Sequence, residues 1–340
     1  GLLKYENVEG SLWPPTHGLD ASNALSGTYP KLFIQGFNSN NSILGINLFT
    51  IWMWRHHNRV ASQLARLNPC WGDDRLFHTA RDINIAVVTQ IFYYELTALL
   101  LGEENLHQDG VLSSSFGHRD LYDENLMPAI ALEYSTVLRW MHTVQEGIAA
   151  KGFPLQYIVD LATNDLSKNR LFGVAPYIAY RKTCFGEDIR TFEDLEVAID
   201  QEKIDLLKEL YSSVEDIELL AGVWTERPVR GARVPATFYC IVAEQLRHFA
   251  ASDRHWYEAA DRPAAFTLRQ LLEIRKATVA RLLCDVGDGV TSIQSRAFLV
   301  PGPGNEFRSC DEIENIDLSA WEDPKCEIIY LNYVMNVHVK

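Results

Sequence analysis

Histidines are the side chains from which a search for chemistry starts, because a neutral imidazole can bind a metal ion and can move protons. His56 and His57 are adjacent, but neighbouring residues of a helix point about 100° apart, so the pair does not suit one ion. His142 lies on an otherwise apolar segment with Arg139 three residues earlier, on the same face of a helix. The other candidates have no partner at ligand spacing: His78, His107, His118, His248 and His255. The chain has no phosphate-binding glycine loop, no paired Cys-x-x-Cys and no His-Glu-x-x-His, so generic motifs do not assign a reaction.

Helices must position these side chains, because apolar residues recur at helical spacing along most of the chain. The pattern predicts a helix over 43–67, ended by Pro69, and a buried helix over 75–101. A further helix over 128–149 would carry Arg139 and His142. The same spacing predicts helices over 155–166, 191–211, 235–250 and 267–284. The sequence therefore predicts a mainly α fold with little β structure.

The chain's ends differ from this pattern. Residues 1–42 are rich in Gly, Pro, Asn and Ser and are expected to form loops and short strands. Residues 328–339 are β-like in composition. No sharp linker interrupts the chain, so we expect one domain over residues 1–325 and a tail over residues 326–340.

Composition excludes several classes of protein. With 47% hydrophobic and 22% charged residues, the 340-residue chain can bury a large core and is not disordered. Its 31 basic against 45 acidic side chains give a net charge of −14, which repels nucleic acids and anionic lipid. The apolar stretch from Ile43 to Trp54 is shorter than the ~20 residues of a membrane-spanning helix. We therefore expect no nucleic-acid partner and no membrane span.

An ordered series of short segments is more informative than any single motif. The segments are Trp54–Ala61, Leu67–Trp71, Leu76–Arg81, Arg139–Thr143, Pro176–Cys184, Asp253–Glu258, Ser309–Ile313 and Asp317–Trp321. Together they resemble the animal haem peroxidase superfamily, from about Leu2 to Trp321, and within it the secreted arthropod peroxidases and peroxidasin. The first residues are also similar to cyclooxygenases, which share the fold. Cyclooxygenases have a radical-forming tyrosine where this chain has Arg139, so the peroxidases are the better match.

The resemblance implies a helical haem domain and gives roles to the matching residues. His142 matches the proximal haem ligand, and Arg139 matches an arginine near the haem propionates. In the family an asparagine accepts a hydrogen bond from the proximal histidine. The matching position is Asp165, with Asn164 adjacent, and either side chain could serve. The implied cofactor is haem b, and the implied partners are hydrogen peroxide and a small donor substrate.

The sequence departs from the family on the distal side of the haem. The distal histidine and the calcium-binding loop beside it match chain N-terminal to Gly1, so a calcium site is not expected here. Ser39 stands at the position of the distal arginine, and Ser42 at that of a glutamate that some members esterify to the haem. The chain is also shortened between His142 and Gly173. We therefore expect a member truncated at its N-terminus and shortened internally, with any haem bound non-covalently.

The cysteines agree with a secreted member of the family. Cys184 with Cys240 and Cys284 with Cys310 match positions that are disulfide-bonded in secreted relatives. Cys70 and Cys326 have no partner assigned by the resemblance. The sequon Asn40-Asn41-Ser42 also fits an extracellular protein.

Two functions follow from these residues. The first is a haem peroxidase that uses hydrogen peroxide to oxidise halide, phenol or tyrosyl donors in the response to oxidative stress. Because distal proton transfer and charge stabilisation are lacking, this chain itself is expected to have weak or no activity. The second is a non-catalytic extracellular interaction protein that keeps the peroxidase scaffold.

Overall fold

The computed structural model describes residues 1–8, 10–18, 31–33, 44–138, 148–149 and 159–326. The chain divides into two compact units. The first unit consists of Gly1–Glu95 and Phe266–Lys340, and the second of Leu96–Ala265. The predicted extents of the domain and of the tail remain predictions.

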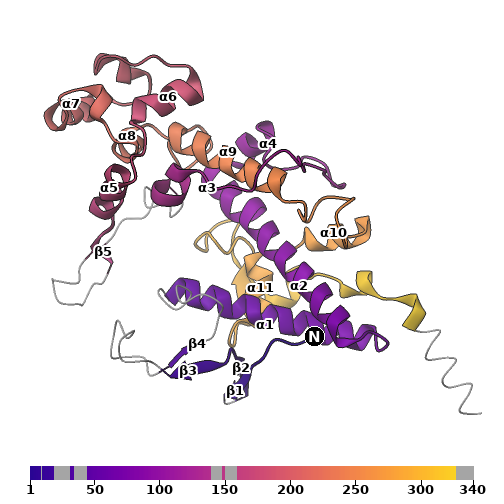
Figure 1. Ribbon diagram of the computed structural model, residues 1–340. Coiled ribbons are helices and arrows are strands. Elements are labelled where there is room, and N and C mark those ends of the chain that lie inside the picture. The colour runs from indigo at the N-terminus through magenta and orange to yellow at the C-terminus, as the bar shows by residue number, and fades with distance from the viewer. Residues whose placement is uncertain (9, 19–30, 34–43, 139–147, 150–158, 327–340) are drawn as a thin grey trace, which may run out of the picture. The chain divides into compact units, whose positions relative to one another are not determined.

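The first unit is built on two long helices with short strands at its edges (Figure 1). Its elements are β1 (Glu6–Val8), β2 (Ser11–Trp13), β3 (Thr16–Gly18), β4 (Lys31–Phe33), α1 (Leu44–Leu67), α2 (Asp73–Gln90), α10 (Leu268–Ile274), α11 (Val279–Val286), β7 (Ser292–Gln294), β8 (Phe307–Ser309), η7 (Cys310–Glu312) and η8 (Leu318–Trp321). The strands form three antiparallel pairs, β1 with β2, β3 with β4 and β7 with β8. The short strands expected within residues 1–42 are therefore present.

Helices α1 and α2 pack against each other and confirm the two long helices that the sequence predicts. On α1, Ile51, Val60 and Leu64 are buried, and on α2 the buried stripe includes Ile83 and Val87. Such a stripe on one face is what an amphipathic helix buries on folding, at about 25 cal/mol per Å² of apolar surface. This packing fixes the orientation of α1 within the unit.

The second unit is a set of shorter helices. Its elements are α3 (Ala98–Leu101), α4 (Glu103–Gln108), η3 (Tyr134–Leu138), β5 (Ile148–Ala149), β6 (Val159–Asp160), α5 (Leu161–Leu171), α6 (Tyr177–Phe185), η5 (Glu193–Val197), α7 (Gln201–Leu210), η6 (Val214–Asp216), α8 (Leu219–Thr225) and α9 (Ala236–Ser252). The π-helical segment η2 (Ile91–Thr97) lies at the boundary between the two units. A cluster of buried side chains that includes Tyr177, Leu195, Ile204 and Ile217 forms the core around α6, α7 and α8.

A buried polar network ties α6 to α9. The guanidinium of Arg181 donates to both carboxylate oxygens of Glu187, at 2.7 and 2.8 Å, and to Glu226. Glu226 in turn accepts from the backbone N–H of Thr237 at 2.9 Å. Because the buried charges are paired, the network secures the start of α9 without an isolated charge in the core.

Three of the predicted helices are shorter than the sequence pattern suggests. The pattern over 267–284 is broken into α10 and α11, because the Thr278 side chain accepts from the N–H of Arg281 and starts a new helix. The pattern over 191–211 is divided into η5 and α7, and Asp200 precedes the second piece. Within 128–149 the described elements are η3 and β5, and residues 139–147 lie outside the described part. The β-like tail over 328–339 also lies outside it.

One helical run is long and apolar enough to cross a membrane by length and composition. It covers Asp73–Leu101, and 44% of its most apolar window is buried inside the protein. Since α2 packs against α1, the run fits a core helix, as the sequence predicts for 75–101. By itself this is weak evidence for a membrane span.

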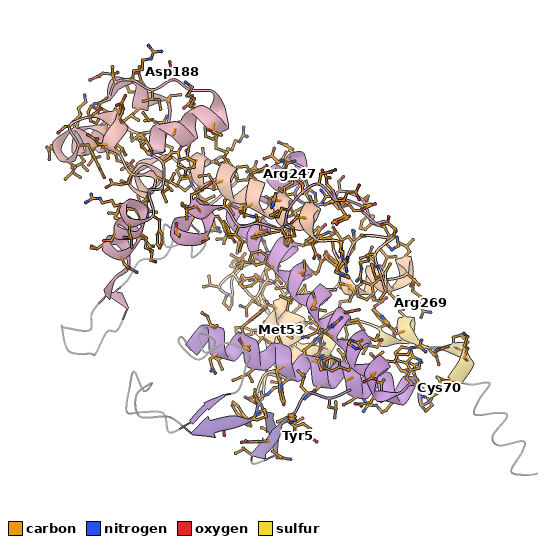
Figure 2. All side chains as sticks on the ribbon, in the orientation of Figure 1. Tyr5, Met53, Cys70, Asp188, Arg247 and Arg269 are labelled. Atoms are coloured by element: carbon orange, nitrogen blue, oxygen red, sulfur yellow. A yellow bond between two sulfur atoms is a disulfide. The ribbon has the colours of Figure 1, made fainter. Side chains whose placement is uncertain are left out.

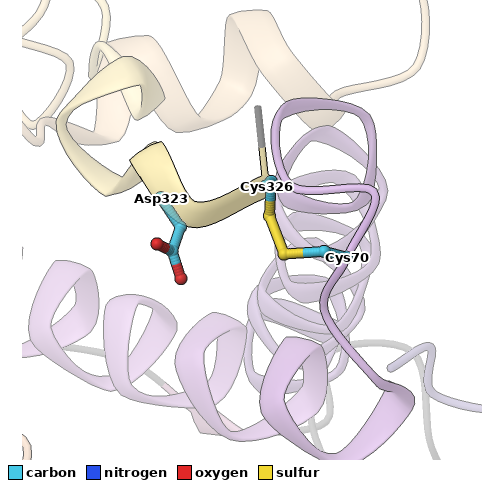
Figure 3. Close-up of side chains that lie close together, drawn as sticks. All are labelled: Cys70, Asp323 and Cys326. Carbon is cyan, nitrogen blue, oxygen red and sulfur yellow. A yellow bond between two sulfur atoms is a disulfide. The ribbon is translucent and has the colours of Figure 1, made fainter. Parts of the chain in front are cut away.

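Three disulfides link distant parts of the sequence. Cys184 is bonded to Cys240 and Cys284 to Cys310, as the family resemblance implies. The two cysteines left unassigned, Cys70 and Cys326, form the third bond (Figure 3). All six cysteines are therefore oxidised, which is typical of proteins from oxidising compartments.

Candidate functional site

Helix α5 carries the residues proposed to support the proximal histidine. The side chain of Asp165 is completely buried, whereas Asn164 beside it is exposed. Adjacent residues of a helix face different directions, so one of the pair turns inward and the other outward. The structure thus separates two positions that the sequence left as alternatives, and Asp165 is the buried one.

Lys168 lies next to the buried carboxylate. Its Nζ is 2.8 Å from Oδ1 of Asp165, and the two residues are three positions apart on α5. The ammonium supplies the opposite charge that a buried carboxylate requires. The sequence pattern ended this helix at residue 166 and so missed Lys168, although its spacing from Asp165 is a recognisable signal on any longer helix.

Asn169 continues the same buried polar face, one turn after Asp165. Its Oδ1 accepts from the backbone N–H of Leu220 at 3.3 Å, which ties α5 to α8. Its Nδ2 is buried and has no hydrogen-bond partner among the described residues. A buried amide donor of this kind requires an acceptor, so the face has capacity to hold a polar group.

The segment that leads to Arg139 and His142 lies beside this helix. Segment η3 ends at Leu138, directly before Arg139, and it packs against both α5 and α9. Tyr134 and Leu138 are buried in these contacts. Arg139 and His142 themselves lie outside the described residues, as do Ser39 and Ser42. The described part therefore brings the start of the predicted histidine segment next to the helix that carries Asp165.

The adjacent histidines His56 and His57 are packing residues. Nδ1 of His56 lies 2.8 Å from Oδ1 of Asn84 on α2, and Nε2 of His57 lies 3.1 Å from the carbonyl oxygen of Gly1. The ring of His57 also meets that of Phe77 edge-on. Burial lowers the pKa of both histidines. Each ring thus has its own neighbours, which agrees with the prediction that the pair does not share an ion.

A second possible metal site is occupied by a disulfide. Within the described part of the chain, one group of potential ligands lies close enough together for an ion: Cys70, Asp323 and Cys326. Figure 3 shows that both sulfur atoms are bonded to each other, with the Asp323 carboxylate beside them. Since a metal ligand must be a thiolate, the oxidised pair does not bind a metal.

Comparison with known families identifies the chain. The model of the family described as animal haem peroxidase matches residues 1–151 and 145–298. The chain belongs to the animal haem peroxidase family. The match falls into two segments that meet at 145–151, within the region where the sequence is expected to be shortened.

The chain is similar to several curated peroxidases. It is 29% identical to a peroxidase of Drosophila melanogaster, over 96% of this chain and 56% of the relative. It is 30% identical to the human peroxidasin homolog, over 86% of this chain and 23% of the relative. The chain thus spans about half the length of the first relative and about a quarter of the second.

A solved structure supports the fold. Peroxidase A from Dictyostelium discoideum superposes with a TM-score of 0.67 at 23% identity, over 84% of this chain and 64% of that protein. The mainly α peroxidase fold that the sequence predicts is therefore confirmed.

Proposed function

We propose that this chain contributes the proximal side of a haem-dependent peroxidase. The whole protein would reduce hydrogen peroxide and oxidise a small halide, phenol or tyrosyl donor in the response to oxidative stress. The observation that carries this proposal is the buried Asp165 on α5, packed beside the segment that leads to His142, in a member of the peroxidase family.

His142 and Asp165 would act as a pair. One imidazole nitrogen of His142 would hold the haem iron, and the N–H of the other would donate a hydrogen bond to the Asp165 carboxylate. A carboxylate is a stronger acceptor than the asparagine amide of the family, so it would make the imidazole more basic. Arg139, three residues from His142, would pair with a haem propionate. Bound haem supplies the electrons that peroxide reduction requires.

The described residues fit this proximal role. Asp165 offers a buried acceptor, and the ammonium of Lys168 pairs with its carboxylate. The Nδ2 of Asn169 is a buried donor that requires an acceptor. The residue types at the distal positions do not fit equally well. Ser39 has no charge with which to stabilise a breaking O–O bond, and Ser42 has no carboxylate for an ester to haem. We therefore propose non-covalent haem b and low turnover for this chain alone.

An extracellular location is part of the proposal. Three disulfides within one chain are typical of secreted proteins. Disulfides persist in the oxidising extracellular environment, where the protein would also meet hydrogen peroxide and its donor substrates.

A non-catalytic interaction protein is the second candidate. Ser39 and Ser42 favour it, because both stand where the family has charged residues. This candidate predicts a folded chain that does not bind haem at a defined position.

Reconstitution with haemin distinguishes the two candidates. We expect wild type to bind haemin stoichiometrically with a Soret band typical of histidine ligation, and H142A to lose that band. D165N is expected to keep haem but to lower the iron–histidine stretching frequency in resonance Raman spectra. H78A, which removes an exposed histidine of α2, is the matched control. Guaiacol oxidation then measures turnover.

An unchanged spectrum in H142A would overturn the proximal assignment. A folded wild-type chain that takes up no haemin would favour the interaction protein.

A further inference from the structure

The first unit contains a pocket of about 410 Å³ that the proposed haem function does not use. It lies between the N-terminal residues, α1 and the end of α11. Tyr5, labelled in Figure 2, belongs to its wall and contacts Trp54 of α1 edge-on at 6.4 Å between ring centroids. A pocket of this volume is at the lower end of the range for small-molecule sites.

One face of α1 lines the pocket with hydrogen-bond donors. Arg55, Arg59 and Ser62 are spaced four and three residues apart, which places them on the same side of the helix. All three side chains can donate hydrogen bonds, and two of them are cations. A ligand at this face therefore meets a row of donors along nearly two turns of helix.

Arg55 is buried and incompletely satisfied. Its side chain is 9% exposed, its Nε donates to the carbonyl of Leu12 at 2.8 Å, and its Nη1 pairs with Asp288 at 2.9 Å. Its Nη2 is buried and has no hydrogen-bond partner in the described part of the chain. Leaving a charged donor unpaired costs free energy, so an acceptor from a ligand would be stabilising here.

Arg59 contributes a second guanidinium. Its Nη2 lies 2.9 Å from Oδ1 of Asp285, and that same oxygen accepts from Arg281 at 2.6 Å. The Asp285 carboxylate is thus shared by two arginines and neutralises only one of them. Arg281 does not line the pocket, so there the two cations Arg55 and Arg59 face the two anions Asp285 and Asp288, and the buried Nη2 of Arg55 is the donor left without an acceptor among the described residues.

Part of the wall is apolar. Leu2, Leu12 and Val286 also line the pocket, together with the polar Ser11 and Asn58. The unpaired guanidinium donor of Arg55 suits a ligand with a single carboxylate, whereas a phosphate dianion would be repelled by Asp285 and Asp288. From this combination we infer that the pocket binds a small organic monocarboxylic acid. The carboxylate lies against Arg55, Arg59 and Ser62, and the apolar body lies against the leucines.

Calorimetric titration of the full chain with benzoate tests this site. We expect saturable binding of benzoate, and binding of benzyl alcohol weaker by on the order of tenfold or more, because the alcohol lacks the charge. R59Q is expected to weaken benzoate binding to a similar degree. R66Q, which removes an exposed arginine from the same helix outside the pocket, is the matched control and should leave binding unchanged.

A second variant separates binding from folding. L12E adds a carboxylate to the pocket wall and keeps the backbone carbonyl that Arg55 uses, so it should abolish benzoate binding while circular dichroism stays unchanged. Equal binding of benzoate to wild type, R59Q and L12E would overturn the inference. So would equal affinity for benzoate and benzyl alcohol, or tighter binding of inorganic phosphate.

Discussion

Nζ of Lys168 lies 2.8 Å from Oδ1 of Asp165, and the aspartate has no exposed surface. Both residues belong to α5, so the ion pair forms as soon as the helix does. On the proposed assignment, the pair places a charged acceptor where the family has an uncharged amide. It therefore connects the stability of the second unit with the proposed basicity of His142.

Removal of Lys168 tests the pair. K168A is expected to lower the free energy of unfolding by roughly 1–3 kcal/mol, because the buried carboxylate loses a charged partner. The double variant D165N/K168A should lose less, since it removes the charge that was left unpaired. Urea unfolding of the two variants and of the control K203A on α7 measures both differences. A double variant less stable than K168A would contradict an ion pair that matters through charge.

Gly222 is predicted to tolerate no side chain. A Cβ at this position would lie 2.1 Å from Cγ of the buried Tyr177, so α8 and α6 would have to separate. We expect G222A to destabilise the protein by at least about 1–3 kcal/mol, as overpacked cores do. G45A on α1 is the matched control, because nothing lies within 4 Å of the added Cβ. Thermal unfolding of both variants measures the contrast, and equal melting temperatures would show that the helices do not pack this closely.

Acid is expected to weaken the first unit through His56. Burial lowers the pKa of this histidine from its usual value of 6.5, so the unfolded chain binds the proton more readily than the folded one. The contribution of His56 is therefore complete above pH 6.5 and is lost as the pH falls toward the lower pKa of the folded state. H56Q should flatten the fall in unfolding free energy below pH 6.5, measured by urea titration at several pH values. H78Q, at an exposed site on α2, should leave the slope as in wild type.

The disulfide between Cys70 and Cys326 holds the end of the described chain to the turn between α1 and α2. The two cysteines are 256 residues apart, against 26 for Cys284 and Cys310. Because a longer loop loses more entropy when it is closed, C70S/C326S should lose roughly 2–4 kcal/mol, more than C284S/C310S. Urea unfolding compares the variants.

Asp323 lies close to the disulfide and also links the end of the described chain to the residues after α1. Its carboxylate accepts from Nε1 of Trp71 at 3.1 Å and pairs with Arg75 at 2.9 Å. Without the disulfide, we expect these contacts to be too weak to keep the residues around Cys326 folded. Amide hydrogen exchange near Cys326 is therefore expected to rise in C70S/C326S. Unchanged exchange would show that the bond contributes nothing locally.

Much of the fold follows from local pattern. The apolar spacing over 43–67 and 75–101 predicts α1 and the helical run from α2 onward, because a helix must bury one stripe. The breaks within 191–211 and 267–284 did not follow from apolar spacing, and the second of them depends on the cap that Thr278 supplies. Family and fold were recognisable because many short segments occur in a fixed order.

For the candidate site, too, the sequence supplied some of the information and the tertiary structure the rest. The sequence by itself determined the family, and it predicted the site residues His142, Arg139 and the pair Asn164 and Asp165. Only the tertiary structure decided that Asp165 is buried, that Lys168 supplies its counter-charge, and that Cys70 is bonded to Cys326. Burial and pairing depend on which segments fold against one another. Cys70 and Cys326 are 256 positions apart, and no local sequence pattern predicts a contact over that separation.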